Sequence, residues 1–155
     1  MPSGRTHLRI EMFVFVACVA SGVYLFQVGL VRSVYIGVFL GSYLFSSLFL
    51  SPDLDLKGSD SFRRWGVARV MWVPYARLFR HRALSHHIIL GPLTRIAYLG
   101  AIVSLVLIAV LHLTGWQVRF SVPQWPMIAA LLCGLYLPNQ IHTVADTVWS
   151  ALHRY

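Results

Sequence analysis

Four long stretches of this chain contain no Asp, Glu, Lys or Arg, and they constrain the possible fold more than any other feature. They cover residues 12–31, 33–52, 96–118 and 120–145. A helix needs about 20 apolar residues to cross the hydrocarbon core of a bilayer. The sequence therefore predicts an all-α membrane protein with four transmembrane helices, at about 11–30, 34–51, 94–114 and 126–150, forming one domain over residues 1–155.

The composition supports a membrane protein. Of its 155 residues, 57% are hydrophobic and only 12% are charged, whereas about a quarter of residues are charged in soluble domains. The first apolar stretch continues well past any signal-peptide cleavage point, which favours a retained anchor. Both cysteines, Cys18 and Cys133, lie in apolar stretches, so we expect neither a disulfide framework nor a cysteine metal motif.

The distribution of basic residues predicts how the chain is oriented. There are 13 Lys and Arg against five acids, a net charge of +8. In the four-helix topology, all 13 fall on one side of the membrane except Arg32 and Arg119. By the positive-inside rule, both termini are cytoplasmic, which predicts a multi-pass membrane protein. In so apolar a chain, the excess of Arg indicates contact with anionic lipid headgroups rather than nucleic acid.

The segment 52–92, between the second and third predicted helices, is too polar to span a membrane. Aromatic and aliphatic residues alternate there with arginines. This pattern predicts a basic interfacial helix broken at Pro74, with its apolar face among the headgroups and with Ser59 or Ser61 as its N-cap. For most of these residues, anchoring the loop is a simpler role than forming a dedicated binding surface.

Asp53 and Asp55 follow the second predicted helix. A spacing of two cannot place both carboxylates on one helical face, but an extended turn after Pro52 can aim both at one centre. Taken alone, this pair is also typical of a turn that caps a helix.

A second cluster contains three histidines within seven residues, His81, His86 and His87. Because the spacing of five between His81 and His86 separates them around an ideal helix, shared coordination would require a helix end or a loop. Such a density of His favours a metal site over isolated structural histidines.

His142 and Asp146 are four residues apart in the last apolar stretch, so they share one helical face. Ionisable groups within a transmembrane helix are costly and usually face the bundle interior with a partner. A metal site and a simple His–Asp pair that stabilises the bundle both satisfy this requirement. His7 lies just ahead of the first predicted helix on the same side of the membrane, whereas His112 and His153 fall outside this group.

The predicted topology thus gathers seven nitrogen and oxygen donors at the cytoplasmic end of a four-helix bundle. This is more than one tetrahedral ion requires and suits two ions of zinc, manganese or iron that activate water for hydrolysis. Arginines pair with phosphate, so Arg64 and Arg82 are candidate contacts for an anionic phosphoester or lipid headgroup. The candidate ligands are His7, Asp53, Asp55, His81, His86, His142 and Asp146.

Several short motifs give the chain a family resemblance that covers nearly its whole length and is most specific over residues 51–98. It resembles a bacterial domain family of unknown function described as metal-binding membrane proteins, which is similar to the LexA-regulated, membrane-bound metal-dependent hydrolases. The resemblance implies metal binding by the same seven residues, and hydrolysis. Leu8 departs from the acidic residue expected after His7. The motifs are Met1-Pro2-Ser3-Gly4-Arg5-Thr6-His7, Ser51-Pro52-Asp53-Leu54-Asp55-Leu56, Arg64-Trp65-Gly66, Trp72-Val73-Pro74-Tyr75, His81-Arg82, Ser85-His86 and His142 with Asp146.

Three functions remain open at this point. The first is an inner-membrane metal-dependent hydrolase with membrane lipids and an anionic substrate as partners. The second is a non-catalytic metal-binding or metal-sensing protein whose ligands saturate the ion, and the third is a structural bundle. Gly37 and Gly41 form a small-xxx-small pattern that suits close packing within the chain or in a homo-oligomer.

Overall fold

The computed structural model describes residues 4–78, 87–119 and 121–152, and all the regular secondary structure within them is helical. The long helices are α1 (Gly4–Gln27), α2 (Ser33–Phe49), α6 (Leu90–Thr114) and α7 (Trp125–Leu152). Between α2 and α6 lie four short elements, η1 (Pro52–Asp55), α3 (Asp60–Arg64), η2 (Gly66–Met71) and α4 (Trp72–Leu78).

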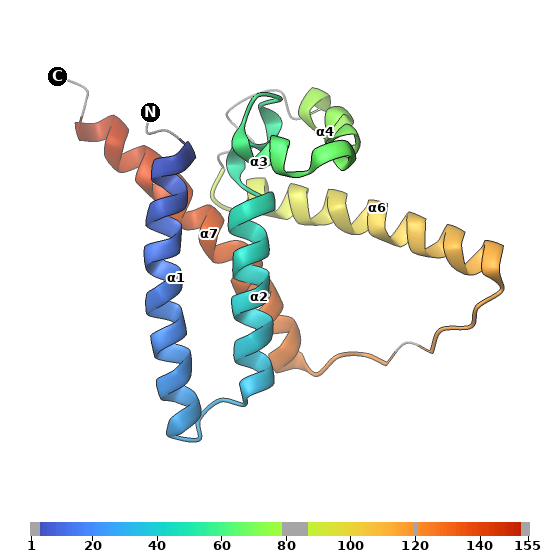
Figure 1. The fold of residues 1–155 in the computed structure, drawn as a ribbon, viewed down its shortest axis with the longest axis horizontal. Helices are drawn as coiled ribbons and strands as arrows, with labels where there is room; N and C mark the ends of the chain where they lie inside the picture. Colours follow the sequence, from blue (N-terminus) through green and yellow to red (C-terminus); the bar gives the residue numbers. More distant parts are fainter. Residues whose placement is uncertain (1–3, 79–86, 120, 153–155) are drawn as a thin grey trace.

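Three of the long helices pack together, and the fourth extends away from them. Figure 1 shows α1 and α2 antiparallel, with α7 crossing beside them and both termini at the end of the molecule that carries α3 and α4. Helix α6 starts at this end and runs crosswise to α1 and α2. The sequence predicted a compact four-helix bundle. The structure differs because the buried residues of α6 lie only in its first two turns, at Gly91, Pro92 and Arg95.

Three helices are long and apolar enough to cross a membrane, namely α1, α6 and α7. Helix α2 is apolar but has 17 residues. Helix α1 begins at Gly4, well before the predicted residue 11, and ends at Gln27, where a turn with Gly29 at φ 73° follows. A positive φ is accessible to glycine at little cost, so this turn connects α1 to α2.

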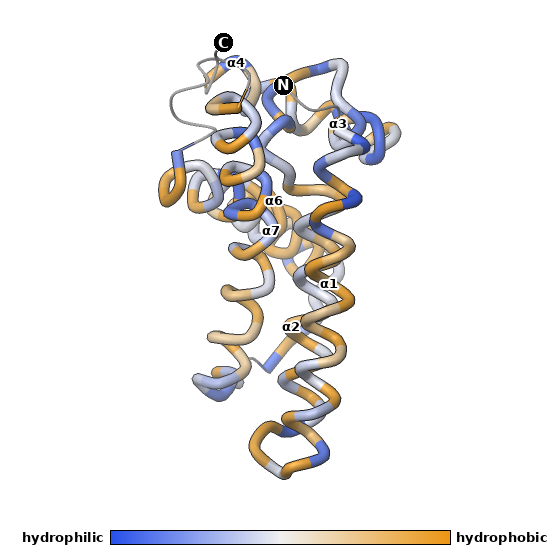
Figure 2. Tube along the Cα trace, turned by 90° about the vertical axis from the view of Figure 1, so that its left-hand side faces the viewer, coloured by the Kyte–Doolittle hydropathy of each residue, from blue (hydrophilic) through white to orange (hydrophobic). Residues whose placement is uncertain are grey.

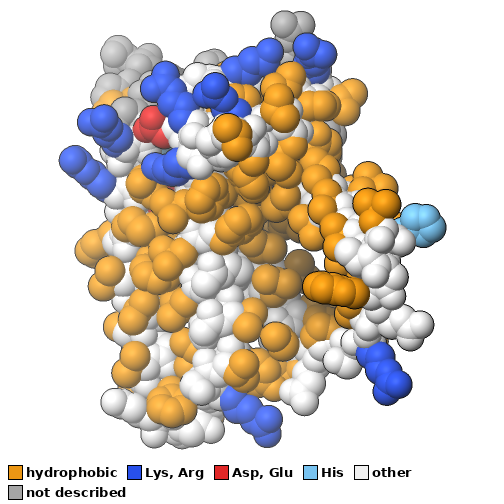
Figure 3. All heavy atoms as spheres, turned by 45° about the vertical axis from the view of Figure 1, so that its right-hand side comes forward, with side chains coloured by type: hydrophobic (Ala, Val, Ile, Leu, Met, Phe, Trp, Pro, Cys, Tyr) orange, Lys and Arg blue, Asp and Glu red, His pale blue; other side chains and the backbone are white. Residues whose placement is uncertain are grey.

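Polar and apolar residues separate along the molecule. In Figure 2 the hydrophilic residues gather at the end that carries the termini and the short helices, while hydrophobic residues dominate the length of α1 and α2. Figure 3 shows many Lys and Arg side chains at this same end, fewer at the opposite end, and a largely hydrophobic surface between. This distribution matches the arginine asymmetry of the sequence.

Helices α2 and α7 make the closest helix contact. A Cβ atom at Gly134 of α7 would collide with the carbonyl oxygen of Phe39 and the hydroxyl of Ser42 on α2. One turn further, the Ser46 hydroxyl donates a hydrogen bond of 2.6 Å to the Leu135 carbonyl oxygen. Small residues allow backbones to approach and hydroxyls to bond across the interface, as is common between membrane helices.

The segment between α2 and α6 forms an aromatic cap instead of the predicted interfacial helix. Its core consists of five buried side chains, Leu50, Leu54, Phe62, Trp72 and Tyr75. Trp72 and Tyr75 are fully buried and therefore face the protein and not lipid headgroups. Aromatic side chains bury the largest apolar area, which explains why this short segment folds back on itself.

The helix boundaries within the aromatic cap agree with the prediction in part. The Ser59 hydroxyl accepts a hydrogen bond of 3.2 Å from the Phe62 amide, which confirms Ser59 as the N-cap of α3. The predicted break at Pro74 is wrong, because α4 begins at Trp72 and so contains Pro74 in its first turn. Proline is tolerated there because the amides of the first turn have no partner within the helix.

Candidate metal centre

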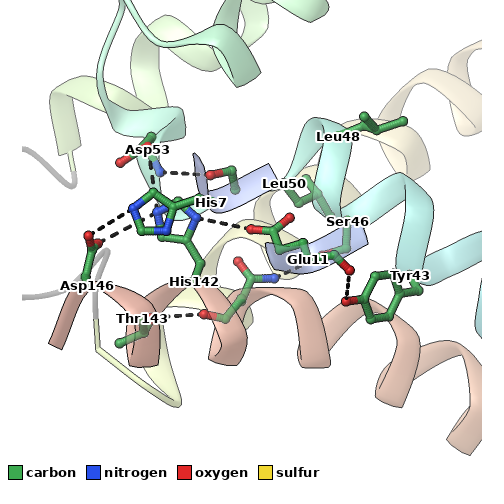
Figure 4. A network of polar contacts seen from close by, with 12 residues as sticks. His7, Glu11, Tyr43, Ser46, Leu48, Leu50, Asp53, His142, Thr143 and Asp146 are labelled. Carbon is green, nitrogen blue, oxygen red and sulfur yellow. Dashed lines mark hydrogen bonds and ion pairs between the residues drawn. The ribbon is translucent and has the colours of Figure 1, made fainter. Parts of the chain in front are cut away.

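Two histidine–carboxylate pairs face each other between α1 and α7. His7 and Glu11 lie one turn apart on α1, and His142 and Asp146 lie one turn apart on α7. All four are buried, with relative exposures of 3%, 3%, 2% and 9% respectively. Figure 4 shows the four side chains converging where the two helices cross, with Asp53 beside them.

Each histidine contacts the carboxylate of the opposite helix. His7 Nε2 lies 3.1 Å from Asp146 Oδ1, and His142 Nδ1 lies 3.2 Å from Glu11 Oε1. The two imidazole rings are stacked, with centroids 3.9 Å apart and an angle of 17° between their planes. The cluster is therefore a cross-linked unit that depends on both helices.

Asp53 approaches the cluster from η1. Its Oδ2 lies 3.7 Å from His142 Nε2, and Asp146 Oδ2 lies 3.8 Å from the same nitrogen. These distances exceed a hydrogen bond. They are close to the separation of about 3.3 Å between two ligands that each lie about 2.0–2.1 Å from one tetrahedral ion. Asp53 and Asp146 thus both lie near His142 Nε2, and the donors that all lie within 4.8 Å of one another are those of His7, His142 and Asp146.

Three further observations test whether a cation fits. The ligand atoms of His7, His142 and Asp146 all lie within 4.8 Å of one another. A cavity of about 20 Å³ borders the cluster, lined by both histidines, Glu11 and Asp53, which is enough for about one water or ion. His7 Nδ1 is buried and has no hydrogen-bond partner within the described residues. A buried ring nitrogen without a hydrogen-bond partner is rare unless a bound ligand supplies that partner.

The charge of the cluster also favours a cation. Glu11, Asp53 and Asp146 place three carboxylates around two imidazoles. Burying carboxylates is costly unless a cation or hydrogen bonds compensate their charge. Buried carboxylates together with imidazoles suit a divalent ion such as zinc, manganese or iron.

A buried arginine beside the cluster connects three segments of the chain by hydrogen bonds. Arg95 of α6 is 1% exposed and donates through Nη1 to the Leu50 carbonyl oxygen at 2.6 Å and to Asn139 Oδ1 at 2.5 Å. Since Leu50 lies two residues before η1, Arg95 links α6 and α7 to the segment that carries Asp53.

The structure brings together four of the seven predicted ligands, namely His7, Asp53, His142 and Asp146. Neither Asp55 nor Asp146 lines the cavity, and Asp146 joins the cluster through its contacts with His7 and His142. Residues 52–55 form a 3₁₀ turn instead of an extended one, and with three residues per turn side chains two apart point in different directions. His81 and His86, and the candidate substrate contact Arg82, lie outside the described residues.

Glu11 is the site residue that sequence reasoning missed. It lies four residues after His7, the same spacing as in the recognised pair of His142 and Asp146. This repeated spacing was the available signal. The predicted first helix begins at about residue 11 and leaves His7 outside it, whereas α1 contains both residues. Arg64, the other candidate substrate contact, lines the same cavity and donates to the Leu48 carbonyl oxygen at 3.1 Å.

One family model matches nearly the whole chain, and one relative matches a part of it. The sequence model of a family described as "uncharacterized metal-binding protein (DUF2227)" matches residues 2–155. A protein of Aquifex aeolicus (strain VF5), named as uncharacterized, is 42% identical over 57 residues, which are 37% of this chain and 40% of that protein. This chain therefore aligns with less than half of that relative's length. No solved structure matches the chain significantly.

Proposed function

The chain belongs to the DUF2227 family of metal-binding proteins, and we propose that it is a membrane protein that binds divalent metal at the cluster between α1 and α7. The observation that carries this proposal is the convergence of His7, His142 and Asp146, whose donor atoms lie within 4.8 Å of one another while the residues are buried. Glu11 and Asp53 complete a set of five donors, more than one tetrahedral ion requires. This excess is the basis for proposing a second ion that shares a carboxylate, while the cavity of about 20 Å³ has room for about one ion.

The metal content of the detergent-purified protein tests this proposal. We expect at least one equivalent of zinc, manganese or iron by elemental analysis in the wild type, and loss of most of it in the His142→Ala and Asp146→Ala variants. His112→Ala is the matched control, since this histidine is exposed and lies at the far end of α6. Wild-type protein without metal, even after incubation with each ion, would leave the cluster as a set of His–carboxylate pairs that only hold the helices together.

We further propose that the bound metal serves hydrolysis of an anionic phosphoester or lipid headgroup. A divalent ion would supply Lewis acidity and lower the pKa of a bound water. Glu11 Oε1 holds His142 through its Nδ1, which keeps Nε2 directed at Asp53 and Asp146. The side chain of Asp53 is 26% exposed, against 12% for Asp146 and 4% for Glu11, so substrate would reach the cluster past Asp53.

Arg64 supports an anionic substrate. It lines the cavity, and guanidinium pairs with phosphate oxygens in a fork geometry. Hydrolysis of a panel of phosphoesters and phospholipids, measured with and without chelator, tests this step. We expect chelator-sensitive turnover that falls at least about tenfold in Arg64→Gln but is unchanged in Arg63→Gln, an exposed neighbour outside the cavity. Turnover that chelator leaves intact on every substrate would argue against metal-dependent hydrolysis.

The alternative function is non-catalytic metal binding or sensing. The small volume of the cavity, about 20 Å³, favours it, because a closed set of donors leaves no position for substrate. Metal-loaded protein without turnover on the whole panel is the result expected for this alternative.

We also propose that the chain lies in the bacterial inner membrane with both termini in the cytoplasm. The end of the molecule with the termini carries most of the Lys and Arg residues, as the positive-inside rule requires of the cytoplasmic side. With 17 residues, α2 is at the lower limit for crossing a bilayer. It would serve as a fourth span beside α1, α6 and α7; because α6 runs crosswise to α1 and α2 in the structure, this proposal requires α6 to align with them in the bilayer.

A further inference from the structure

An apolar cleft of about 970 Å³ lies far from the metal-binding cluster, where α1 and α2 are connected. Figures 1 and 2 show α1 and α7 close together near the termini and apart at the opposite end. Small residues line this cleft, Ser21 and Gly22 from α1 and Ala129 and Ala130 from α7. The volume falls in the range of about 300–1,000 Å³ that is typical of pockets for small ligands.

The polar groups of this cleft lie at one end of it. Arg32, at the start of α2, lines the cleft and is exposed. The neighbouring Tyr35 hydroxyl donates to Gln124 Oε1 at 2.7 Å. None of the five acids of the chain lines the cleft, so the charge of Arg32 has no carboxylate there to neutralise it. An apolar cleft with a cation at its end matches the chemistry of an amphiphile with an anionic head.

We propose that this cleft binds an anionic phospholipid, with acyl chain against the small residues of α1 and α7 and the phosphate at Arg32. The site is separate from the metal centre and rests on the membrane location proposed above, but not on metal binding. Arg32 is one of only two arginines predicted for the non-cytoplasmic side. Positive charge is rare on that side of membrane proteins, which a lipid-binding role for Arg32 explains.

Native mass spectrometry of the full chain in detergent tests the proposal, with phosphatidylglycerol or phosphatidylethanolamine added. We expect one retained phosphatidylglycerol per chain in the wild type, and an apparent affinity lower by about fivefold in Arg32→Gln, the effect of one arginine on an anionic lipid. Arg32→Lys keeps the charge and should retain the lipid. Arg119→Gln is the matched control, because this exposed arginine is predicted on the same side and does not line the cleft.

A second variant tests the acyl-chain contact independently of charge. Ala129→Phe fills the cleft and should abolish the adduct. Equal retention of both lipids, or retention that neither variant changes, would overturn the proposal. A lipid-free dimer that Ala129→Phe dissociates would also overturn it, by assigning the cleft to a second copy of the chain. Metal content is measured on the same samples to distinguish failure of the lipid proposal from failure of the metal proposal. Arg32→Gln and Ala129→Phe should leave the metal content unchanged whether or not lipid binds.

Discussion

Glu11 illustrates how one residue acquires its role from a partner far away in the sequence. Its carboxylate contacts the Nδ1 of His142, 131 residues further along the chain. A carboxylate that accepts the second ring proton of a metal-binding histidine fixes its tautomer and orientation and raises its basicity. Glu11 is thus suited either to bind metal directly or to position His142.

The isosteric substitution Glu11→Gln tests this role. We expect metal affinity to fall by about 10- to 100-fold, the usual cost of removing such a carboxylate partner, as measured by competition with a fluorescent chelator. Asp60→Asn is the matched control, because Asp60 lines the same cavity but is exposed. Its affinity should change less than about twofold. If both substitutions lowered metal affinity equally, Glu11 would act only through its negative charge near the site.

Arg95 is the second residue whose role depends on partners distant in the sequence. Replacing it with Met leaves the carbonyl oxygen of Leu50 and the Asn139 side chain without their donor. Since hydrogen bonds to a buried charge are costly to remove, we expect the free energy of unfolding in detergent to fall by about 3 kcal/mol. The exposed Arg77→Met serves as control and should be within about 0.5 kcal/mol of the wild type. Similar stability of both variants would contradict a structural role for Arg95.

At the scale of elements, the contact between α2 and α7 positions the site. Ser46 bonds to Leu135, and the Asn139 side chain donates to Ser46 Oγ at 3.0 Å. Asn139 lies one turn before His142, so these bonds place the metal-binding face of α7 relative to α2. The close approach at Gly134 makes this geometry possible.

Gly134→Ala should disturb this interface. The added methyl group collides with backbone and side-chain atoms of α2, and we expect a loss of about 1–3 kcal/mol in the free energy of unfolding, as for other overpacked positions. Gly100→Ala is the matched control within α6, because a Cβ there meets no atom within 4 Å. Thermal unfolding in detergent compares the two. A Gly134→Ala variant as stable as Gly100→Ala would contradict the close packing of α2 and α7.

At the scale of the whole molecule, charge and the metal-binding cluster lie at the same end. The termini, the aromatic cap and the cluster all lie at the end rich in arginine, while the α1–α2 connection lies at the other end. If the chain crosses a membrane as proposed above, the positive-inside rule predicts that the cluster lies at the cytoplasmic surface.

Cysteine labelling tests this orientation. In a background with Cys18 and Cys133 replaced by Ser, single cysteines are introduced by Leu30→Cys and Val67→Cys, at positions 72% and 97% exposed. We expect an impermeant maleimide to label the Leu30→Cys variant in intact spheroplasts and the Val67→Cys variant only after permeabilisation. The reverse pattern would place the metal centre on the outer side.

The apolar stretches by themselves determined the helices. The positions of α6 and α7 follow the predicted ranges closely, and Ser59 capped α3 as expected, because hydropathy and capping depend on neighbours in sequence. The pair of His142 and Asp146 was recognisable for the same reason, since its spacing is local.

Only the tertiary structure decided which of the other polar residues meet. It joined Glu11 to His142, brought Asp53 to the cluster, and separated α6 from the other long helices. It also buried Trp72 and Tyr75 in a protein core. These outcomes depend mainly on the angle at which α7 crosses α1. This angle arises from packing between segments distant in sequence, which no local pattern specifies.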